Sequence, residues 1–204
     1  MKIAVIGPGN VGSALAEGWA NKGHKIFLGT RNPEDEKYNE LISNENISIH
    51  SIEDAAEIAD VILIALPPEA LKEVCDQFGD LSDKVIIDAM NSFSSKAGDF
   101  ESTSYAIKDW TNCWDVVKCF NTIGYEGMKN PDYNGISADM FTAGDSAKGK
   151  EIAMKLSNDL GFETCYDFGG DDKFTLLEEL AFAWINLAIF RKAGRDIAFK
   201  VLKR

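Results

Sequence analysis

The chain has 204 residues, of which 45% are hydrophobic and 26% are charged, as is typical of one globular domain. Its formal net charge of -12 at pH 7 argues against binding to nucleic acid or to an anionic membrane surface, because both need a basic face. The four cysteines (Cys75, Cys113, Cys119 and Cys165) form no C-x-x-C pair and have no histidine at metal-ligand spacing. We therefore expect reduced, buried thiols, no metal site and a cytoplasmic protein.

Apolar runs alternate with amphipathic or polar segments along the chain, which predicts parallel strands separated by helices. We expect strands at residues 3–6, 25–29, 61–66, 84–89, 115–120, 140–143 and 163–166. We expect helices from residue 11 onward and at 33–43, 52–58, 69–78, 105–110, 146–160, 174–192 and 195–202, with an irregular stretch at 124–135. The pattern predicts an α/β fold with a mostly parallel, doubly wound sheet and C-terminal helices.

The first strand leads directly into a glycine-rich turn that opens a helix. The turn reads Gly7-Pro8-Gly9-Asn10-Val11-Gly12. In this context Gly7 permits a tight turn, Gly9 lets a pyrophosphate approach the backbone, and Gly12 lets the helix pack close to the strand. The helix N-terminus offers free N–H groups and the positive end of its dipole to the phosphates. The alternative is an ordinary strand-to-helix turn. The placement favours a single Rossmann-type NAD(P)-binding domain over residues 1–204.

The end of the second strand predicts which dinucleotide is bound. An NAD site carries an acidic residue there, about 20 residues past the glycines, which binds the ribose 2′-hydroxyl. Here the chain has Thr30, Arg31 and Asn32, and the first acidic residue after the strand is Glu34. A hydroxyl, a guanidinium and an amide all suit a 2′-phosphate, and arginine binds it with two hydrogen bonds. NADP(H) is therefore the expected cofactor, with a solvated turn and a chance arginine as the alternative.

Ligands of open α/β sheets gather at the carboxyl ends of the strands. Beyond the glycine turn and residues 30–32, these ends are residues 66–68, Asn91 and residues 120–122. Side chains there suit positioning of a ligand, through amide hydrogen bonds and an apolar wall, better than acid–base chemistry. The positioning candidates are Asn91, Phe120, Asn121 and Thr122.

Three ionisable residues lie near the same strand ends, namely Asp88, Lys118 and Tyr125. A proton donor is needed to reduce a carbonyl or an imine, whereas hydride exchange with a flavin-like ring mostly needs stacked geometry. We expect structural roles for all three residues and assign no catalytic acid or base. His24 and His50 are expected at the surface or in loops, and not as ligands.

The segment from Leu180 to Phe190 is apolar except for Asn186. A bilayer span needs roughly 20 apolar residues, so we expect a helix that is buried on most of its sides. One sheet face covers only one side, and a two-fold partner is the commonest source of a second surface. Residues 172–204 are therefore expected to form a helical extension at the contact of a homodimer. In a monomer, the segment from Gly124 to Ile136 would have to cover the helix instead.

Taken together, the strand-end motifs resemble those of the NADPH-dependent deazaflavin (coenzyme F420) reductase family over nearly the whole chain. The matching pieces are residues 6–12, 29–32, 65–68, 88–91, 118–122 and 144–145, and the C-terminal residues 176–181 and 184–185. The resemblance implies that NADPH lies along the strand ends and passes a hydride to a small-molecule acceptor, a deazaflavin or a flavin.

The resemblance also implies roles for individual residues. Gly9, Asn10 and Val11 would contact the pyrophosphate, and Thr30, Arg31 and Asn32 would contact the 2′-phosphate. Leu66 and Pro67 would flank the adenosine or its ribose. Asn91 and Asn121–Thr122 would lie near the nicotinamide. The chain departs from the family pattern at Ser92–Phe93 and at residues 166–170, where the second cofactor would pack, so the acceptor stays open between coenzyme F420 and a flavin.

Two other functions share the same N-terminal half. The first is an NADP-dependent reductase of a small imine or carbonyl, a class whose members carry a further helical domain with substrate residues. The second is a non-catalytic NADP(H)-binding sensor. Turnover of flavin-like acceptors by NADPH distinguishes the leading hypothesis from the sensor, and a screen of imines and hydroxy acids distinguishes it from the small-molecule reductase.

Overall fold

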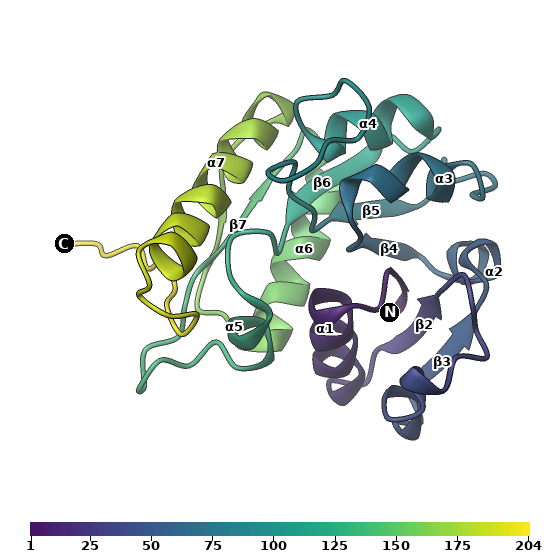
Figure 1. Cartoon of the computed structure of the whole chain (residues 1–204), viewed down its shortest axis with the longest axis horizontal. Helices are drawn as coiled ribbons and strands as arrows, with labels where there is room; N and C mark the ends of the chain where they lie inside the picture. Colours follow the sequence, from purple (N-terminus) through teal and green to yellow (C-terminus); the bar gives the residue numbers. More distant parts are fainter.

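Eight strands form one sheet in the computed structural model, which describes residues 1–204 (Figure 1). The strands are β1 Lys2–Ile6, β2 Lys25–Gly29, β3 Ile47–His50, β4 Val61–Ile64, β5 Val85–Asp88, β6 Asp115–Cys119, β7 Met140–Ala143 and β8 Cys165–Asp167. Their order across the sheet is β3-β2-β1-β4-β5-β6-β7-β8. Neighbouring strands run parallel, except that β7 is antiparallel to β6. This order confirms the predicted doubly wound α/β sheet.

Helices cover both faces of the sheet. They are α1 Asn10–Asn21, α2 Ile52–Ile58, α3 Leu71–Cys75, α4 Thr103–Trp110, α5 Tyr125–Lys129, α6 Ala147–Leu160 and α7 Phe174–Ile185. Helices α1, α5 and α6 pack on one face, and α2, α3 and α4 on the other. Helix α7 packs on β7 beside α4, where the rings of Tyr105 and Phe174 meet edge to face. No helix combines the length and the apolar character that crossing a membrane would take.

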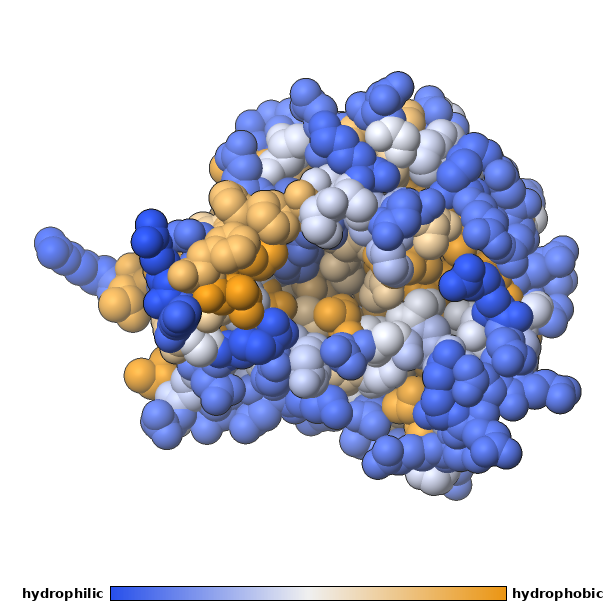
Figure 2. All heavy atoms as spheres, in the orientation of Figure 1, coloured by the Kyte–Doolittle hydropathy of each residue, from blue (hydrophilic) through white to orange (hydrophobic).

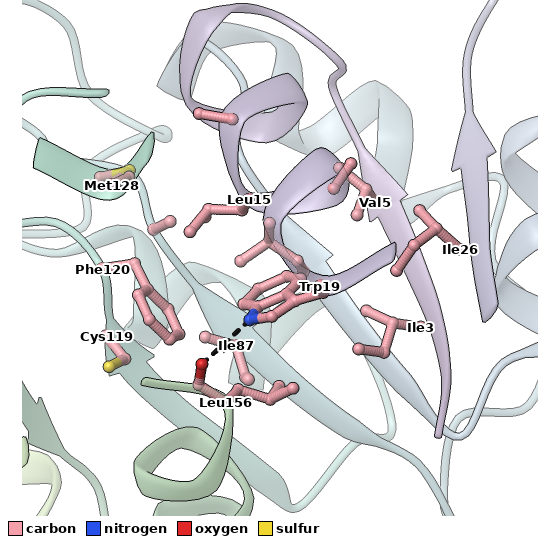
Figure 3. Close-up of a cluster of buried hydrophobic side chains, with 14 of the residues drawn as sticks. Ile3, Val5, Leu15, Trp19, Ile26, Ile87, Cys119, Phe120, Met128 and Leu156 are labelled. Atoms are coloured by element: carbon pink, nitrogen blue, oxygen red, sulfur yellow. Dashed lines mark hydrogen bonds between the residues drawn. The ribbon is translucent and has the colours of Figure 1, made fainter. Parts of the chain in front are cut away.

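The larger core lies between the sheet and helices α1 and α6, with Trp19 of α1 at its centre (Figure 3). The Trp19 indole N–H donates to the carbonyl of Leu156 in α6 at 3.0 Å, so this polar group is satisfied although it is buried. The ring meets Phe120 edge to face, with centroids 5.4 Å apart. Trp19 thereby fixes α1, and with it the glycine turn that precedes the helix, against the second half of the sheet.

The strand sequences explain why the sheet is covered on both faces. Every residue of β4 is apolar and buried, because the side chains on both faces of a central parallel strand pack against helices. The parallel register of β1, β2, β4 and β5 brings their carboxyl ends to one edge of the sheet. The loops that follow these strands therefore meet there.

Two predicted helices are wrong because polar groups hold the backbone in other conformations. Residues 33–43 form two single 3-10 turns, Glu36–Tyr38 and Leu41–Ser43, and Asp35 accepts from the backbone N–H of Lys37. Such local side-chain bonds compete with a continuing helix. Residues 195–202 contain no helix, since the buried Asp139 accepts from the backbone N–H of Val201 at 2.8 Å and its own N–H donates to Phe199.

Other boundaries differ from the expected ones. The stretch 124–135, predicted to be irregular, contains the short helix α5. The α-helical part of the predicted helix 174–192 ends at Ile185 and continues as a π-helical turn, Asn186–Phe190. Residues 69–78 form a 3-10 turn, Pro68–Ala70, followed by the short α3. The extended C-terminal segment lies against α7, where the Trp184 indole N–H donates to the carbonyl of Ile197.

His24 lies in the loop before β2, as one of the two expected placements, but it is not at the surface. Its imidazole is buried between the amino group of Met1 and the carboxylate of Asp159, which lies at the end of α6. Burial lowers the pKa of His24 below its usual value, and this outweighs the opposing effect of Asp159. His50 is half-buried at the end of β3 and bonds to Ser48. A histidine in a turn can thus become a tertiary contact when a distant helix end supplies its partner.

Candidate functional site

The three glycines of the first turn occupy three different environments. Gly7 has a φ of 93°, and a side chain there would also lie 2.5 Å from the carbonyl oxygen of Ala65. A side chain at Gly12 would overlap the carbonyl oxygen of Gly7, so the helix packs on the turn without room for a methyl group. At Gly9 a Cβ would meet nothing within 4 Å. The fold therefore requires glycine at positions 7 and 12 but not at position 9.

Gly9 precedes the free end of α1. It caps the helix with extended backbone and without a side-chain hydrogen bond. Asn10 is exposed and Val11 half-buried in the first turn of the helix. The first N–H groups of a helix have no partner inside it, so this end offers donors to an anion.

A cavity of ≈ 390 Å³ opens beside the glycine turn, between the ends of β1, β2 and β4. Its lining includes Gly7, Pro8, Gly9, Thr30, Arg31, Leu66 and Pro67, all predicted to contact the cofactor. A second cavity, of ≈ 270 Å³, lies on the other side of the turn and includes Pro8, Gly9 and Asn10. Figure 2 shows that this face of the molecule is hollowed near its middle, where apolar atoms are visible between hydrophilic ones.

Two cations and a buried hydroxyl pair lie at the end of β2. Thr30 is buried, and its hydroxyl bonds to that of Tyr38 at 3.1 Å. Arg31 is exposed at the cavity, and Lys37 lines both cavities. Lys37 donates a hydrogen bond to the Asp35 carboxylate, which raises the pKa of Lys37, so its ammonium is fully charged at neutral pH. In a chain of net charge -12, this pair of cations favours an anion at this site.

The ends of β5 and β6 are joined by a pair of amide side chains. The Asn91 side-chain N–H donates to the backbone carbonyl of Asn121 at 3.0 Å. The side-chain NH₂ of Asn121 donates in return to Oδ1 of Asn91 at 2.9 Å, and also to the backbone carbonyl of Leu177 at 3.2 Å. Oδ1 of Asn121 is buried and has no hydrogen-bond partner. A buried acceptor of this kind costs folding free energy unless a ligand supplies a donor.

The chain matches, over residues 2–92, the family model described as "NADP oxidoreductase coenzyme F420-dependent". It is 24% identical to the F420-dependent NADP reductase of Methanocaldococcus jannaschii over 218 aligned positions, which cover 97% of each chain. Both comparisons thus relate the chain to coenzyme F420-dependent NADP oxidoreductases, the family model through the N-terminal part and the relative through nearly the whole chain. The match includes the glycine turn, the end of β2 and Asn91.

Other similarities are partial or concern the fold alone. The chain is 33% identical to a glycerol-3-phosphate dehydrogenase [NAD(P)+] of Chlorobium phaeobacteroides over 113 residues, which span only 34% of that relative. A crystal structure from Arthrobacter sp. FB24 superposes over both whole chains with a TM-score of 0.85 and 24% identity. A reductive aminase from Aspergillus terreus matches 94% of this chain but 62% of its own length, with a TM-score of 0.70 and 17% identity. These structures support the Rossmann-type fold.

The residues present fit the NADP(H) cofactor that the matched family model names. Gly9 leaves open space for a pyrophosphate beside the free end of α1, and Arg31 and Lys37 can hold a 2′-phosphate. Oδ1 of Asn121 is an unpaired acceptor that suits a carboxamide N–H, but Asn91 and Asn121 are not among the residues that line the two cavities. Asn32 is exposed beyond Thr30 and lies outside the lining of the larger cavity.

The side chains of Phe120 and Thr122 lie in the protein interior and not at a cavity. Both side chains are buried, and that of Phe120 packs on Trp19, so it does not form the expected apolar wall for a ligand. Phe120 has a φ of 61°, a left-handed conformation that bulky residues seldom adopt. This turn directs Phe120 into the core and places Asn121 next to Asn91.

Of the three ionisable candidates, Asp88 and Lys118 lie outside the lining of both cavities, and Tyr125 lies at the second one. Lys118 and Asp88 are wholly buried and form an ion pair, with Nζ and Oδ2 2.7 Å apart. Tyr125 lies on α5 at the second cavity, beneath the guanidinium of Arg195. The structural roles expected for Lys118 and Asp88 agree with this burial.

Sequence reasoning missed two residues that line the larger cavity, Lys37 and Tyr38. They lie in the segment that was expected to form a polar helix, where no strand end marked them. The available signal was their short distance in sequence from Thr30 and Arg31. It also missed Glu178, which bonds to the Asn91–Ser92 segment from the far C-terminal helix.

Proposed function

We propose that the protein transfers a hydride between NADP(H) and a deazaflavin or flavin-like acceptor. The observation that supports this most strongly is the glycine turn, where the fold needs Gly7 and Gly12 but leaves open space at Gly9. A glycine that folding does not require, at a helix N-terminus beside two cations, fits close approach of a dinucleotide. The M. jannaschii relative, named an F420-dependent NADP reductase, aligns over nearly all of this chain.

The chain's own residues bind and orient in this proposal. The free N–H groups of α1 hold the pyrophosphate, and Arg31 with Lys37 holds the 2′-phosphate. The Asn91–Asn121 pair fixes the carboxamide of the nicotinamide. The nicotinamide ring supplies the hydride when the dinucleotide is bound. No buried charge next to this pair is free to give a proton, because Lys118 is bonded to Asp88 and Glu178. Positioning two stacked rings is therefore the main task of the site.

The test is NADPH oxidation with four separate acceptors: coenzyme F420, FMN, a cyclic imine and a hydroxy acid's keto form. We expect oxidation with F420 or FMN and none with the imine or the keto acid. NADPH binding without oxidation of any of the four would instead favour a sensor. Turnover of the imine alone would favour a small-molecule reductase.

We also propose that the protein works as a homodimer through α7 and the turn that follows it. Phe93, Phe182 and Phe190 form an exposed aromatic cluster, with the rings of Phe93 and Phe182 stacked at 4.5 Å. Phe190, the last residue of the turn after α7, is 57% exposed. Apolar atoms gather over α7 in Figure 2. Such a patch supports a protein contact.

Sedimentation velocity tests the dimer. The wild-type protein should sediment as a dimer at micromolar concentration, and Phe190→Asp should shift it to a monomer. Trp114→Asp is the matched control, because Trp114 is exposed but lies at the other end of the sheet strands, before β6. A monomeric wild-type protein would contradict the proposal.

We further propose a cytoplasmic location. All four cysteines are free thiols in the structure, and three of them are buried. Free thiols persist in reducing compartments. Fractionation of the host's cells with an antibody to the protein tests the location, and recovery in an extracytoplasmic fraction would contradict it.

A further inference from the structure

Helix α7 holds the two strand ends that carry the amide pair. The Glu178 carboxylate accepts from the backbone N–H of Ser92 at 2.8 Å, so it fixes the residue that follows Asn91. The preceding helical residue, Leu177, accepts from the Asn121 side chain at 3.2 Å. Two consecutive residues of one helix thus bind the loops after β5 and β6, which lie far from α7 in sequence.

The hydrogen bonds leave one orientation for each amide. The carbonyls of Asn121 and Leu177 can only accept, so the Asn91 and Asn121 side chains must turn their N–H groups toward them. Oδ1 of Asn121 is then the atom left without a partner, in a residue that is 5% exposed. Oγ of Ser92, the residue that Glu178 binds, is also buried without a partner.

Glu178 is itself fixed by a buried charge network. Its Oε1 accepts from the hydroxyl of Ser102 at 2.6 Å and lies 3.0 Å from Nζ of Lys118. Lys118 also bonds to Asp88 and to the carbonyl of Met90, one residue before Asn91. Burial alone would lower the pKa of Lys118, but the two carboxylates outweigh it and raise the pKa, so the network is held by a charged lysine.

This network contains more charge than a buried ion pair needs. Lys118 already has Asp88 as a full partner, and a second carboxylate, which is largely shielded from solvent, adds a desolvation penalty. The second carboxylate has an evident use, because its other oxygen, Oε2, holds the backbone of Ser92. Main-chain fixation at the strand end is therefore what Glu178 adds.

We propose that Glu178 is a positioning residue for the nicotinamide end of the dinucleotide site, acting through Ser92 and the Asn91–Asn121 pair to hold Asn121 Oδ1 ready for an amide donor. The proposal rests on the proposed binding of NADP(H). It assigns Glu178 no contact with the ligand, and no role at the phosphate end near Gly9 and Arg31. The two ends of the ligand should therefore respond differently to its substitution.

The test compares two ligands by calorimetry: NADPH, and 2′-phospho-ADP-ribose, which has every group except the nicotinamide. Glu178→Gln preserves shape and leaves Lys118 paired with Asp88, but one amide oxygen cannot serve both Ser92 and the Lys118–Ser102 side. We expect NADPH affinity to fall on the order of 10-fold, the size of one lost hydrogen bond, while the affinity for 2′-phospho-ADP-ribose is unchanged. Glu179→Gln is the control, because this neighbour is exposed, and it should change neither affinity.

A second comparison shows whether Glu178 acts through Asn121. Asn121→Ala should lower NADPH affinity selectively in the same way, and adding Glu178→Gln to it should cause no further loss. If Glu178→Gln does not fold, Glu178→Asp keeps the charge next to Lys118, shortens the reach to Ser92, and should show the same ligand-selective loss.

Equal losses for both ligands, or no loss for either, would overturn the proposed role of Glu178 while leaving NADP(H) binding intact. A wild-type protein that binds neither ligand would instead refute the proposed function, and the role of Glu178 with it. The wild-type measurement thus separates the two failures before any variant is compared.

Discussion

Replacing Gly9 by alanine should stabilise the protein and weaken its binding of NADPH. The backbone of Gly9 has φ -81° and ψ -161°, an extended conformation that alanine also adopts, and its Cβ would meet no atom within 4 Å. Alanine loses less conformational entropy on folding, which is worth about 0.4–1 kcal/mol at a compatible site. For a chain of this length the midpoint of thermal unfolding should rise by about 1–4 °C.

The same methyl group fills the space that the pyrophosphate would use. Loss of one charge-assisted hydrogen bond there lowers NADPH affinity by at least about 10-fold. At a ligand concentration of 100 times the wild-type Kd, NADPH stabilises the wild-type protein by about 2.7 kcal/mol, and a 10-fold weaker variant by about 1.4 kcal/mol. The ligand-induced rise in Tm should therefore fall to about half or less.

Thermal unfolding with and without NADPH measures both effects in one experiment. Gly79→Ala is the matched control, because a Cβ at Gly79 also meets nothing within 4 Å and the residue lies outside both cavities. It should show the same small stabilisation and keep the full response to NADPH. A Gly9→Ala protein with the wild-type response to NADPH would refute the assignment of the glycine turn as the phosphate site.

Three further outcomes are expected. Arg31→Ala should lower NADPH affinity by about 10- to 100-fold and leave NADH affinity nearly unchanged in calorimetry, and equal losses would remove the 2′-phosphate assignment. Burial lowers the pKa of His24 below 6.5, so the unfolded chain binds more protons, and the unfolding free energy measured with urea should decrease as the pH falls below 6.5. The decrease should be weaker in His24→Gln, and a decrease as large as that of the wild-type protein would contradict this origin. Burial raises the pKa of Cys75 to about 12 and that of Cys113 to about 11, so brief iodoacetamide treatment at neutral pH should alkylate Cys165 and leave these two thiols intact. Mass spectrometry measures this pattern, and early modification of Cys75 would contradict it.

The sequence by itself was sufficient for the features that depend on short stretches of chain. The glycine turn is one of them, because Gly7 and Gly12 have conformational and packing requirements set by their immediate neighbours. The buried strands are another, since a run such as Val61–Ile64 is apolar at every position only when both faces are covered. The alternation of such runs with helices leads to the doubly wound sheet without further information.

Local patterns predicted less well where polar side chains decide the backbone. Residues 33–43 have a composition that suits a helix, yet Asp35 bonds to the backbone and the segment forms 3-10 turns that place Lys37 at the cavity. The C-terminal residues 195–202 form no helix, because Asp139, which lies just before β7, accepts a hydrogen bond from the backbone N–H of Val201. Helix propensity is a small energy per residue, and one such hydrogen bond exceeds it.

Only the tertiary structure decided which residues act together at the strand ends. Lys118, Asp88 and Glu178 come from β6, β5 and α7, and nothing in the spacing of these residues indicates that they share one buried network. The same holds for the bonds of Asn121 to Asn91 and to Leu177. A buried charge is stable only beside its partner, and the partner is chosen by how helices and strands pack, not by its position along the chain.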